Sequence, residues 1–196
     1  EEYRRRLAAL EQVSLASSRV LDPDRLARIA LDETIRILGA ERALLFLVDS
    51  APDRLVPRLG RDAAGADLAE LTGYSGTLVE RVRHERQAIV VAGTDEGVAL
   101  GSESARLHGL RSIIIAPLCL NERLLGVVYL DSRVAKGIFT VDDIDILTAI
   151  TNQVAVALET ARAAQLEVAV AAVERQRDLA ETLREAMNEI SGTLDP

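Results

Sequence analysis

The chain has 196 residues and a formal net charge of −8, and 48% of its residues are hydrophobic while 3% are aromatic. Its length and hydrophobic content suffice for one domain with an aliphatic core plus additional helix. The acidic charge argues against binding to nucleic acid or to an anionic membrane surface. The single cysteine, Cys119, excludes an intramolecular disulfide and fits a reducing compartment, so we expect a cytoplasmic protein.

Two helices are predicted at the start of the chain. Residues 2–20 contain neither glycine nor proline, and Leu7 and Leu10 begin a narrow apolar stripe at helical spacing. Asp22 and the proline after it predict a second helix, because aspartate caps a helix and proline suits its first position. Gly39 is placed to end that helix in a left-handed conformation.

Three strands and a helix are predicted next. Residues 43–49 are apolar on both faces, and residues 55–59 follow as a paired strand that Pro57 assigns to a sheet edge. Residues 75–86 predict a helix that begins at a serine cap, and residues 89–91 predict a short strand.

A hairpin over residues 111–131 is the strongest strand signal in the chain. Two β-branched apolar runs flank a polar turn at Asn121, Glu122 and Arg123. Both runs are apolar on both faces, which predicts the middle of a sheet that is covered on two sides.

A long helix is predicted from about residue 141 to residue 190, with Thr140 as its cap. At 1.5 Å per residue it would be roughly 75 Å long, so its second half should project from the domain. Heptad-like apolar spacing, with a break near Arg175 and Asp178, predicts pairing with a second copy of the chain; the alternative is a helix folded back on its own domain. The residues assigned to the dimer helices are Leu7, Leu10, Leu147, Ile150, Val154, Ala157, Ala161, Leu179, Leu183 and Ile190.

Four segments carry a resemblance to a known family. They read RSIIIAPLCLNERLLGVVYLD (111–131), GIFTVDDIDILTAITNQVAVALETAR (137–162), GTLVERVRHERQAIVV (76–91) and ERALLFLVD (41–49). Together they resemble the GAF domain of bacterial signal-transduction proteins, as found ahead of histidine kinase, Ser/Thr kinase, cyclase or activator outputs. The resemblance implies an α/β (α+β) fold with a six-stranded antiparallel sheet, helices on both faces, a small-molecule pocket, and long terminal helices that dimerise and relay signals.

Residues 183–196 repeat the pattern of residues 10–23, with five identical positions that end in the same Leu-Asp-Pro. Chance similarity between two helix ends is one explanation, and a tandem array that stops where a second copy begins is the one that we favour. The chain also begins without methionine and lacks a signal-peptide pattern, as an internal piece of a longer protein would. The expected organisation is an N-terminal helix at 1–20, a sensor domain at 21–162, a coiled-coil linker at 163–190 and the start of a second repeat at 191–196.

The sequence lacks most of the residues needed for cyclic-nucleotide binding, bilin attachment or methionine-sulfoxide reduction. Cyclic-nucleotide-binding members carry an Asn-Lys…Phe…Asp-Glu signature, of which only Phe139 and Asp143 are present, and we interpret these two as a core anchor and a helix-start carboxylate. Phytochrome-like members of the family attach a bilin to a cysteine in a pocket helix. Cys119 lies in the hairpin instead, which argues against an attached bilin. One cysteine also cannot perform methionine-sulfoxide reduction, which needs a second, resolving thiol.

No metal, haem or catalytic site is expected. His84 and His108 are the only histidines, and we interpret both as surface or loop residues, although haem ligation by His108 is conceivable. Nucleophile, kinase and phosphate-loop motifs are missing from the sequence, so we expect no enzyme activity. The candidate ligand pocket would be lined by Phe46, Tyr74, Leu78, Leu107, His108, Ser112 and Tyr129.

Two functions remain open on the sequence. The first is a sensory module that binds a small molecule and signals through a homodimer. The second is a spacer in which the same side chains only fill the core and no ligand binds.

Overall fold

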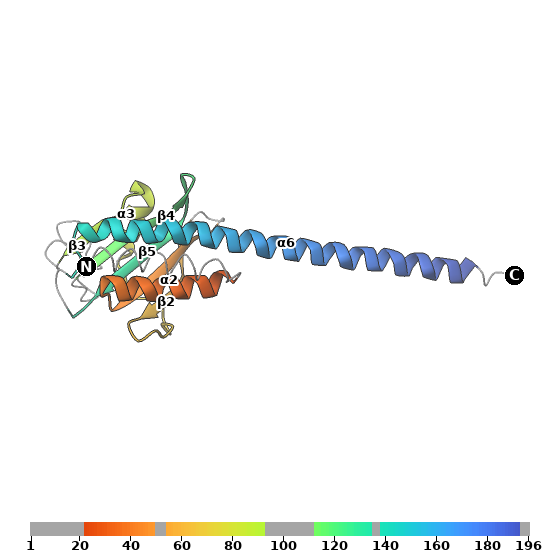
Figure 1. The fold of residues 1–196 in the computed structure, drawn as a ribbon, viewed down its shortest axis with the longest axis horizontal. Helices are drawn as coiled ribbons and strands as arrows, with labels where there is room; N and C mark the ends of the chain where they lie inside the picture. The colour runs from red at the N-terminus through yellow and green to blue at the C-terminus, as the bar shows by residue number, and fades with distance from the viewer. Residues whose placement is uncertain (1–21, 50–53, 93–111, 135–137, 193–196) are drawn as a thin grey trace.

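A computed structural model describes residues 22–49, 54–92, 112–134 and 138–192 (Figure 1). The described elements are α2 (Pro23–Leu38), β1 (Arg42–Asp49), β2 (Arg54–Asp62), α3 (Gly76–Glu85), β3 (Ile89–Ala92), β4 (Ser112–Leu120), β5 (Arg123–Ser132) and α6 (Asp142–Gly192). The expected helix at 1–20 lies outside the described residues, as do residues 193–196 of the expected repeat at 191–196.

The five described strands form one antiparallel sheet in the order β2-β1-β5-β4-β3. The family resemblance predicted six strands, and the described part of the chain contains five. β5 lies at the centre, as the doubly apolar hairpin predicted, and Pro57 lies on the edge strand β2. Asn121 and Glu122 form the hairpin turn with φ of 49° and 64°, the left-handed pair that a two-residue turn requires, so Arg123 belongs to β5 rather than to the turn.

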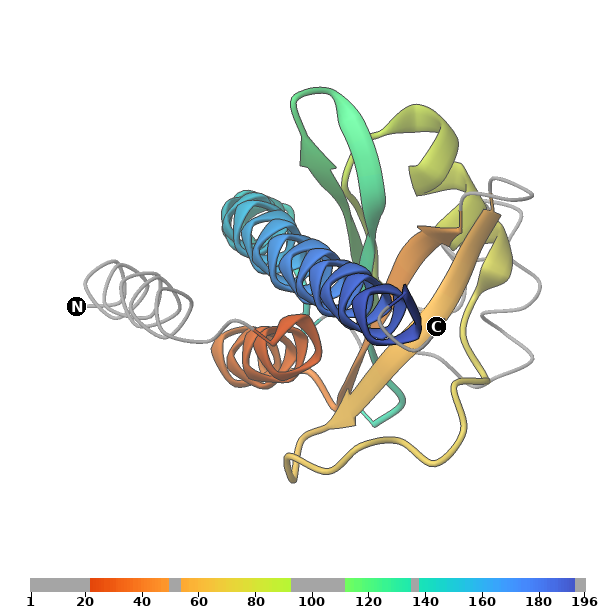
Figure 2. The same ribbon diagram turned by 90° about the vertical axis from the view of Figure 1, so that its right-hand side faces the viewer.

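The sheet separates two hydrophobic cores. α2 and α6 lie side by side over one face, which we call the α2/α6 face, and α3 covers the other, the α3 face (Figure 2). Strand alternation assigns neighbouring residues to different cores: Ile114 packs beneath the long helix, whereas Ile113 and Ile115 pack toward α3.

The predicted caps of α2 are present, whereas Ser75 occupies the predicted cap position of α3 without a side-chain capping hydrogen bond. The Asp24 amide donates to Oδ1 of Asp22 at 3.0 Å, and Gly39 ends α2 with φ of 67°. At the start of α6, both the amide and the hydroxyl of Thr140 donate to the Asp143 carboxylate, at 2.8 and 2.9 Å. Asp143 therefore acts as a helix-start carboxylate, as the sequence predicted.

α6 is one continuous helix of 51 residues, and its two parts have different environments (Figure 1). Up to Ala161 its apolar stripe is buried against the sheet and α2; beyond Arg162 its described side chains are largely exposed. This corrects the predicted dimer contacts, because Leu147, Ile150, Val154 and Ala161 are buried in their own domain and Ala157 packs against the same core. Only Leu179 and Leu183 of the assigned residues are described as exposed. Leu7 and Leu10 lie outside the described residues, as does the side chain of Ile190.

No helix in the described part of the chain combines the length and the hydropathy that a membrane span needs.

Candidate functional site

Three aromatic rings form the centre of the α3 face. The ring centroids of Phe46 and Tyr74 are 4.8 Å apart, and Tyr129 lies 6.4 Å from Phe46 and 6.3 Å from Tyr74, all in edge-to-face arrangements. Leu78 of α3 is fully buried in the same core. The structure therefore brings together four of the seven predicted pocket residues.

The other three predicted residues are not part of this cluster. Leu107 and His108 lie outside the described residues. Ser112 is buried, but its hydroxyl oxygen accepts a hydrogen bond from the Phe139 amide at 3.3 Å, and Phe139 belongs to the core of the α2/α6 face. Strand alternation thus directs Ser112 away from the three rings.

The Tyr129 hydroxyl connects the sheet to the start of α3. It accepts a hydrogen bond from the Ser75 amide at 3.4 Å, next to the first residue of the helix. Burial, together with the nearby Asp131 carboxylate, raises the pKa of Tyr129 well above its ordinary value, so this phenol stays protonated at neutral pH. The hydroxyl is fully buried, and its hydrogen bond helps to fix the start of α3 against the sheet.

A buried ion pair that the sequence analysis missed borders the same cluster. The Arg42 guanidinium donates to both carboxylate oxygens of Asp131 at 2.7 Å, and Asp131 is fully buried. Arg42 also donates to the carbonyls of Thr72 and Gly73, which lead into α3. The two charged residues are direct register partners on β1 and β5, so a correct pairing of these strands would have revealed the contact.

Glu41, the residue before Arg42, also binds the end of β5 and the residues that follow it. Glu41 accepts hydrogen bonds from the Ser132 hydroxyl at 2.8 Å and from the amides of Arg133 and Val134 at 3.0 and 2.9 Å. Burial alone would raise the pKa of Glu41, but the hydrogen bonds from Arg133, Ser132 and Val134 outweigh it and lower that pKa. Glu41, just before β1, and Arg42, its first residue, thus both bind the end of β5 or the residues that follow it.

Replacing Glu41 with glutamine should therefore remove a pH-dependent part of the stability. Because the pKa of Glu41 is lower in the folded state, its contribution is present above the unfolded pKa and is lost as the pH falls through the folded pKa. Urea midpoints of Glu41→Gln and the parent chain should differ at pH 7, and the gap should narrow as the pH falls from 4.5 toward about 3. A gap of equal size at both pH values would contradict this role of the carboxylate.

Cys119 lies near the outer end of the hairpin and is half-buried. Burial raises the pKa of its thiol, against an opposing effect of Arg86. A raised pKa suits a small packing residue rather than a reactive thiolate. Among the described residues, no group of three or more His, Cys, Asp or Glu side chains is placed to hold a metal ion.

A family model described as the GAF domain matches residues 22–158. The chain belongs to the GAF family. GAF domains are a family of regulatory and sensory modules in signalling proteins, and they are generally not catalytic.

Solved structures show the same fold at low sequence identity. Free methionine-R-sulfoxide reductase from Neisseria meningitidis, solved with its substrate, is 20% identical with a TM-score of 0.67, covering 84% of this chain and 94% of its own. The GAF domain of a phosphoenolpyruvate-protein phosphotransferase from Acinetobacter is 13% identical with a TM-score of 0.59, at 80% and 94% coverage. JSC1_58120g3 with bound biliverdin IXa is 16% identical with a TM-score of 0.61, at 79% and 99% coverage.

These identities establish a shared fold and no shared ligand. No curated protein sequence matches the chain significantly. The three structures nevertheless show that one GAF scaffold occurs in a reductase, in a phosphotransferase and in a bilin-binding protein. What this GAF domain does therefore depends on its own side chains.

Proposed function

We propose that this GAF domain is a cytoplasmic sensory module of a bacterial signal-transduction protein. In this proposal it binds a small molecule on the α3 face and relays the signal through dimeric terminal helices to a downstream output domain. The observation that supports it most is the continuity of α6, which packs on the sheet over its first turns and then leaves the domain without a break. A helix of this kind transmits a change in sheet packing to whatever follows it.

The projecting part of α6 exposes apolar side chains that a second copy would cover. The large exposed residues beyond the domain are Leu166, Val168, Val170, Val173, Leu179 and Leu183, each between 55% and 66% exposed. Leu166, Val170 and Val173 follow the four-three spacing of a packed helix pair, and Leu179 and Leu183 resume it after a change of register. Burying such a stripe against its own copy removes it from water in one step.

A double substitution in this stripe tests the dimer. We expect the parent chain to sediment as a dimer and Leu179→Glu/Leu183→Glu to sediment as a monomer, because the two new carboxylates of each chain would have to be buried at the helix pair. Arg177→Gln/Arg184→Gln makes the same change in net charge at exposed positions and should remain dimeric. A monomeric parent chain at micromolar concentration would refute the homodimer.

The alternative function is a spacer that dimerises but binds nothing on the α3 face. Its support is the tight contact among Phe46, Tyr74 and Tyr129, which already fill part of the space that a ligand would need. A thermal-shift screen with nucleotides, amino acids and small metabolites separates the two functions, since a bound ligand raises the melting temperature. Stabilisation that is lost in Tyr74→Ala supports the sensor, and a screen without any stabilising compound supports the spacer.

Cyclic-nucleotide binding is a less favoured function. Only Phe139 and Asp143 match the signature of that subgroup, and both are used structurally: Phe139 is buried in the α2/α6 core and Asp143 binds Thr140. An enzymatic role is also disfavoured, because Cys119 is the only cysteine and its thiol pKa is raised.

A further inference from the structure

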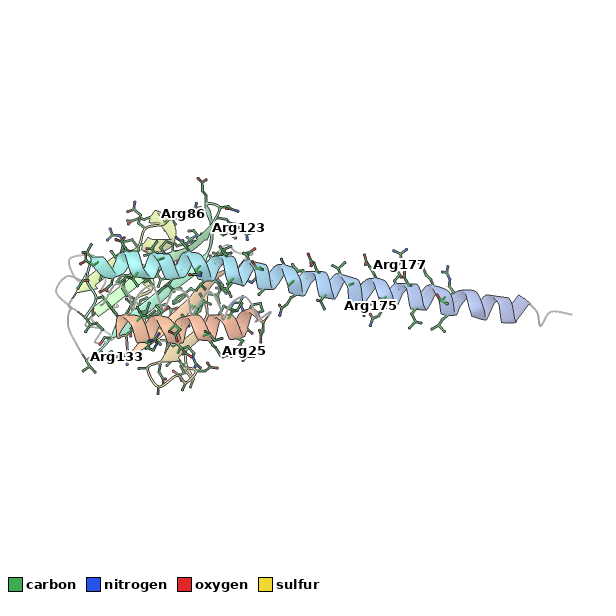
Figure 3. The ribbon with its side chains drawn as sticks, in the orientation of Figure 1. Arg25, Arg86, Arg123, Arg133, Arg175 and Arg177 are labelled. Atoms are coloured by element: carbon green, nitrogen blue, oxygen red, sulfur yellow. The ribbon has the colours of Figure 1, made fainter. Side chains whose placement is uncertain are left out.

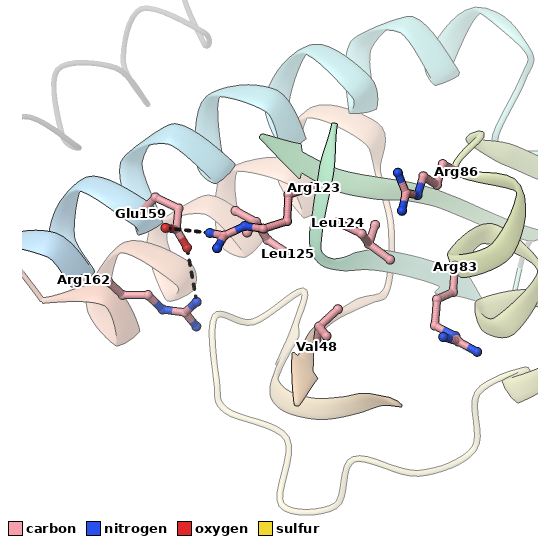
Figure 4. A pocket seen from close by; sticks show the side chains of 8 residues that line it. All are labelled: Val48, Arg83, Arg86, Arg123, Leu124, Leu125, Glu159 and Arg162. Atoms are coloured by element: carbon pink, nitrogen blue, oxygen red, sulfur yellow. Dashed lines mark ion pairs between the residues drawn. The ribbon is translucent and has the colours of Figure 1, made fainter. Parts of the chain in front are cut away.

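Four arginines gather around one hollow at the end of the domain where α6 departs. The hollow has a volume of about 420 Å3 and is lined by Val48, Arg83, Arg86, Arg123, Leu124, Leu125, Glu159 and Arg162 (Figure 4). We call it the arginine groove. It shares no residue with the aromatic cluster of the α3 face. Its arginines come from α3 and the residue that caps its end, from the hairpin and from α6.

The arginines lie on two sides of an apolar floor. Val48 and Leu124 separate Arg83 and Arg86 from Arg123 and Arg162 (Figure 4). Arg86 is held in place by a hydrogen bond from its Nη1 to the Glu122 carbonyl at 2.7 Å. The apolar floor can contact the apolar part of a bound molecule, while guanidinium groups on both sides of the floor reach the same molecule.

The charge in the groove is unbalanced. Glu159 is the one carboxylate in the lining; its oxygens lie 2.9 Å from Arg123 and 3.7 Å from Arg162 (Figure 4). Outside the lining, Glu80 pairs with Arg83 at 2.7 Å. The lining itself holds four arginines and one carboxylate, in a chain whose net charge is −8.

We propose that the arginine groove binds a small molecule that carries phosphate groups on an apolar or aromatic body, such as a nucleoside diphosphate. Guanidinium groups present paired donors that match phosphate oxygens, and the volume falls within the range of about 300–1,000 Å3 typical of small-molecule sites. The overall acidity of the chain works against an extended polyanion such as nucleic acid, whereas a small ligand experiences mainly the local field.

A ligand here would act directly on the helix that leaves the domain. Among the α6 side chains that the structure describes, Ala161 is the last one buried, and Glu159 and Arg162 lie on either side of it in the sequence. Phosphate oxygens that bind Arg123 and Arg162 would compete with Glu159 for the contact between the hairpin and α6. The site thus goes beyond the proposed α3-face sensor and would give the helix a second input.

Calorimetric titration of the full chain with ADP and with inorganic pyrophosphate tests this site. ADP should bind more tightly than pyrophosphate because only ADP has a body to place on Val48 and Leu124. In Arg86→Gln/Arg123→Gln the affinity for ADP should fall by about tenfold per arginine or more, as expected for lost charge-assisted hydrogen bonds. The control Arg175→Gln/Arg177→Gln makes the same charge change on the projecting helix, and its affinity should match that of the parent (Figure 3).

Glu159→Gln gives the sharpest readout, since a gain in affinity cannot result from misfolding. Removing the competing carboxylate should tighten ADP binding several-fold, whereas Glu181→Gln on the projecting helix should leave it unchanged. Three outcomes overturn the proposal: no heat with either probe, equal loss in the groove and control arginine variants, or weaker binding by Glu159→Gln. Binding of an oligoglutamate peptide more tightly than ADP would also overturn it, in favour of an acidic protein segment.

Discussion

Gly126→Ala should lower the free energy of unfolding by about 3 kcal/mol or more, or abolish folding altogether. Gly126 lies in β5 between Leu47 of β1 and Leu118 of β4, so strands on both sides hold its backbone in place. A Cβ atom at this position would lie 2.0 Å from the carbonyl oxygen of Phe46. The obstructing atom belongs to the backbone and not to the movable end of a side chain, so β1 and β5 would have to separate.

Urea unfolding of Gly126→Ala beside Gly76→Ala measures this effect. Gly76 is the first residue of α3, and a Cβ added there meets no atom within 4 Å. Alanine at that position should leave stability unchanged or raise it by up to about 1 kcal/mol, because it reduces the freedom of the unfolded chain. Similar midpoints for the two variants would show that β1 and β5 are not packed as described.

Asp131→Asn should cost about 3–5 kcal/mol of stability, the amount that is typical when one partner of a buried ion pair is lost. The carboxylate is fully buried, and the Arg42 side chain is only 13% exposed. The amide nearly preserves the shape of the side chain but leaves the guanidinium without its counter-charge. Since Arg42 also holds the carbonyls of Thr72 and Gly73, the approach to α3 should loosen as well.

Two comparisons isolate the buried pair. Glu181→Gln removes one partner of the exposed Arg177–Glu181 pair, where the N···O distance is 3.1 Å, and should change stability by less than about 0.5 kcal/mol. The double variant Arg42→Met/Asp131→Asn should be less destabilised than the sum of its single substitutions, because no charge then remains buried alone. Additive losses would indicate that the two side chains act independently.

Residue patterns within short segments of the sequence were sufficient to predict much of the fold. The hairpin, its central place in the sheet, the edge position of Pro57 and the caps at Asp22, Gly39 and Thr140 are all found where the sequence predicted them. Each of these depends on residues close together in the chain, through β-branched runs, a missing proline amide or a capping carboxylate. The same segments also indicated the GAF family, which the family model confirms.

Helical periodicity alone could not show which surface an apolar stripe faces. Leu147, Ile150 and Val154 were assigned to a dimer, yet they pack on the sheet of their own domain. A stripe at three-four spacing fits a sheet as well as a second helix, so the distinction needs the position of the sheet. Similarly, Ser112 was placed with the pocket, but its position in the strand turns it toward Phe139.

The sequence by itself determined most of the described elements, the caps of α2 and the family, because these follow from contacts between near neighbours in the chain. Only the tertiary structure brought Arg42 to Asp131, set Gly126 against the Phe46 carbonyl, and gathered four arginines from three elements around one hollow. Contacts of this kind join residues tens of positions apart. They depend on strand register and helix placement, which are settled by the packing of the whole domain rather than by any segment of it.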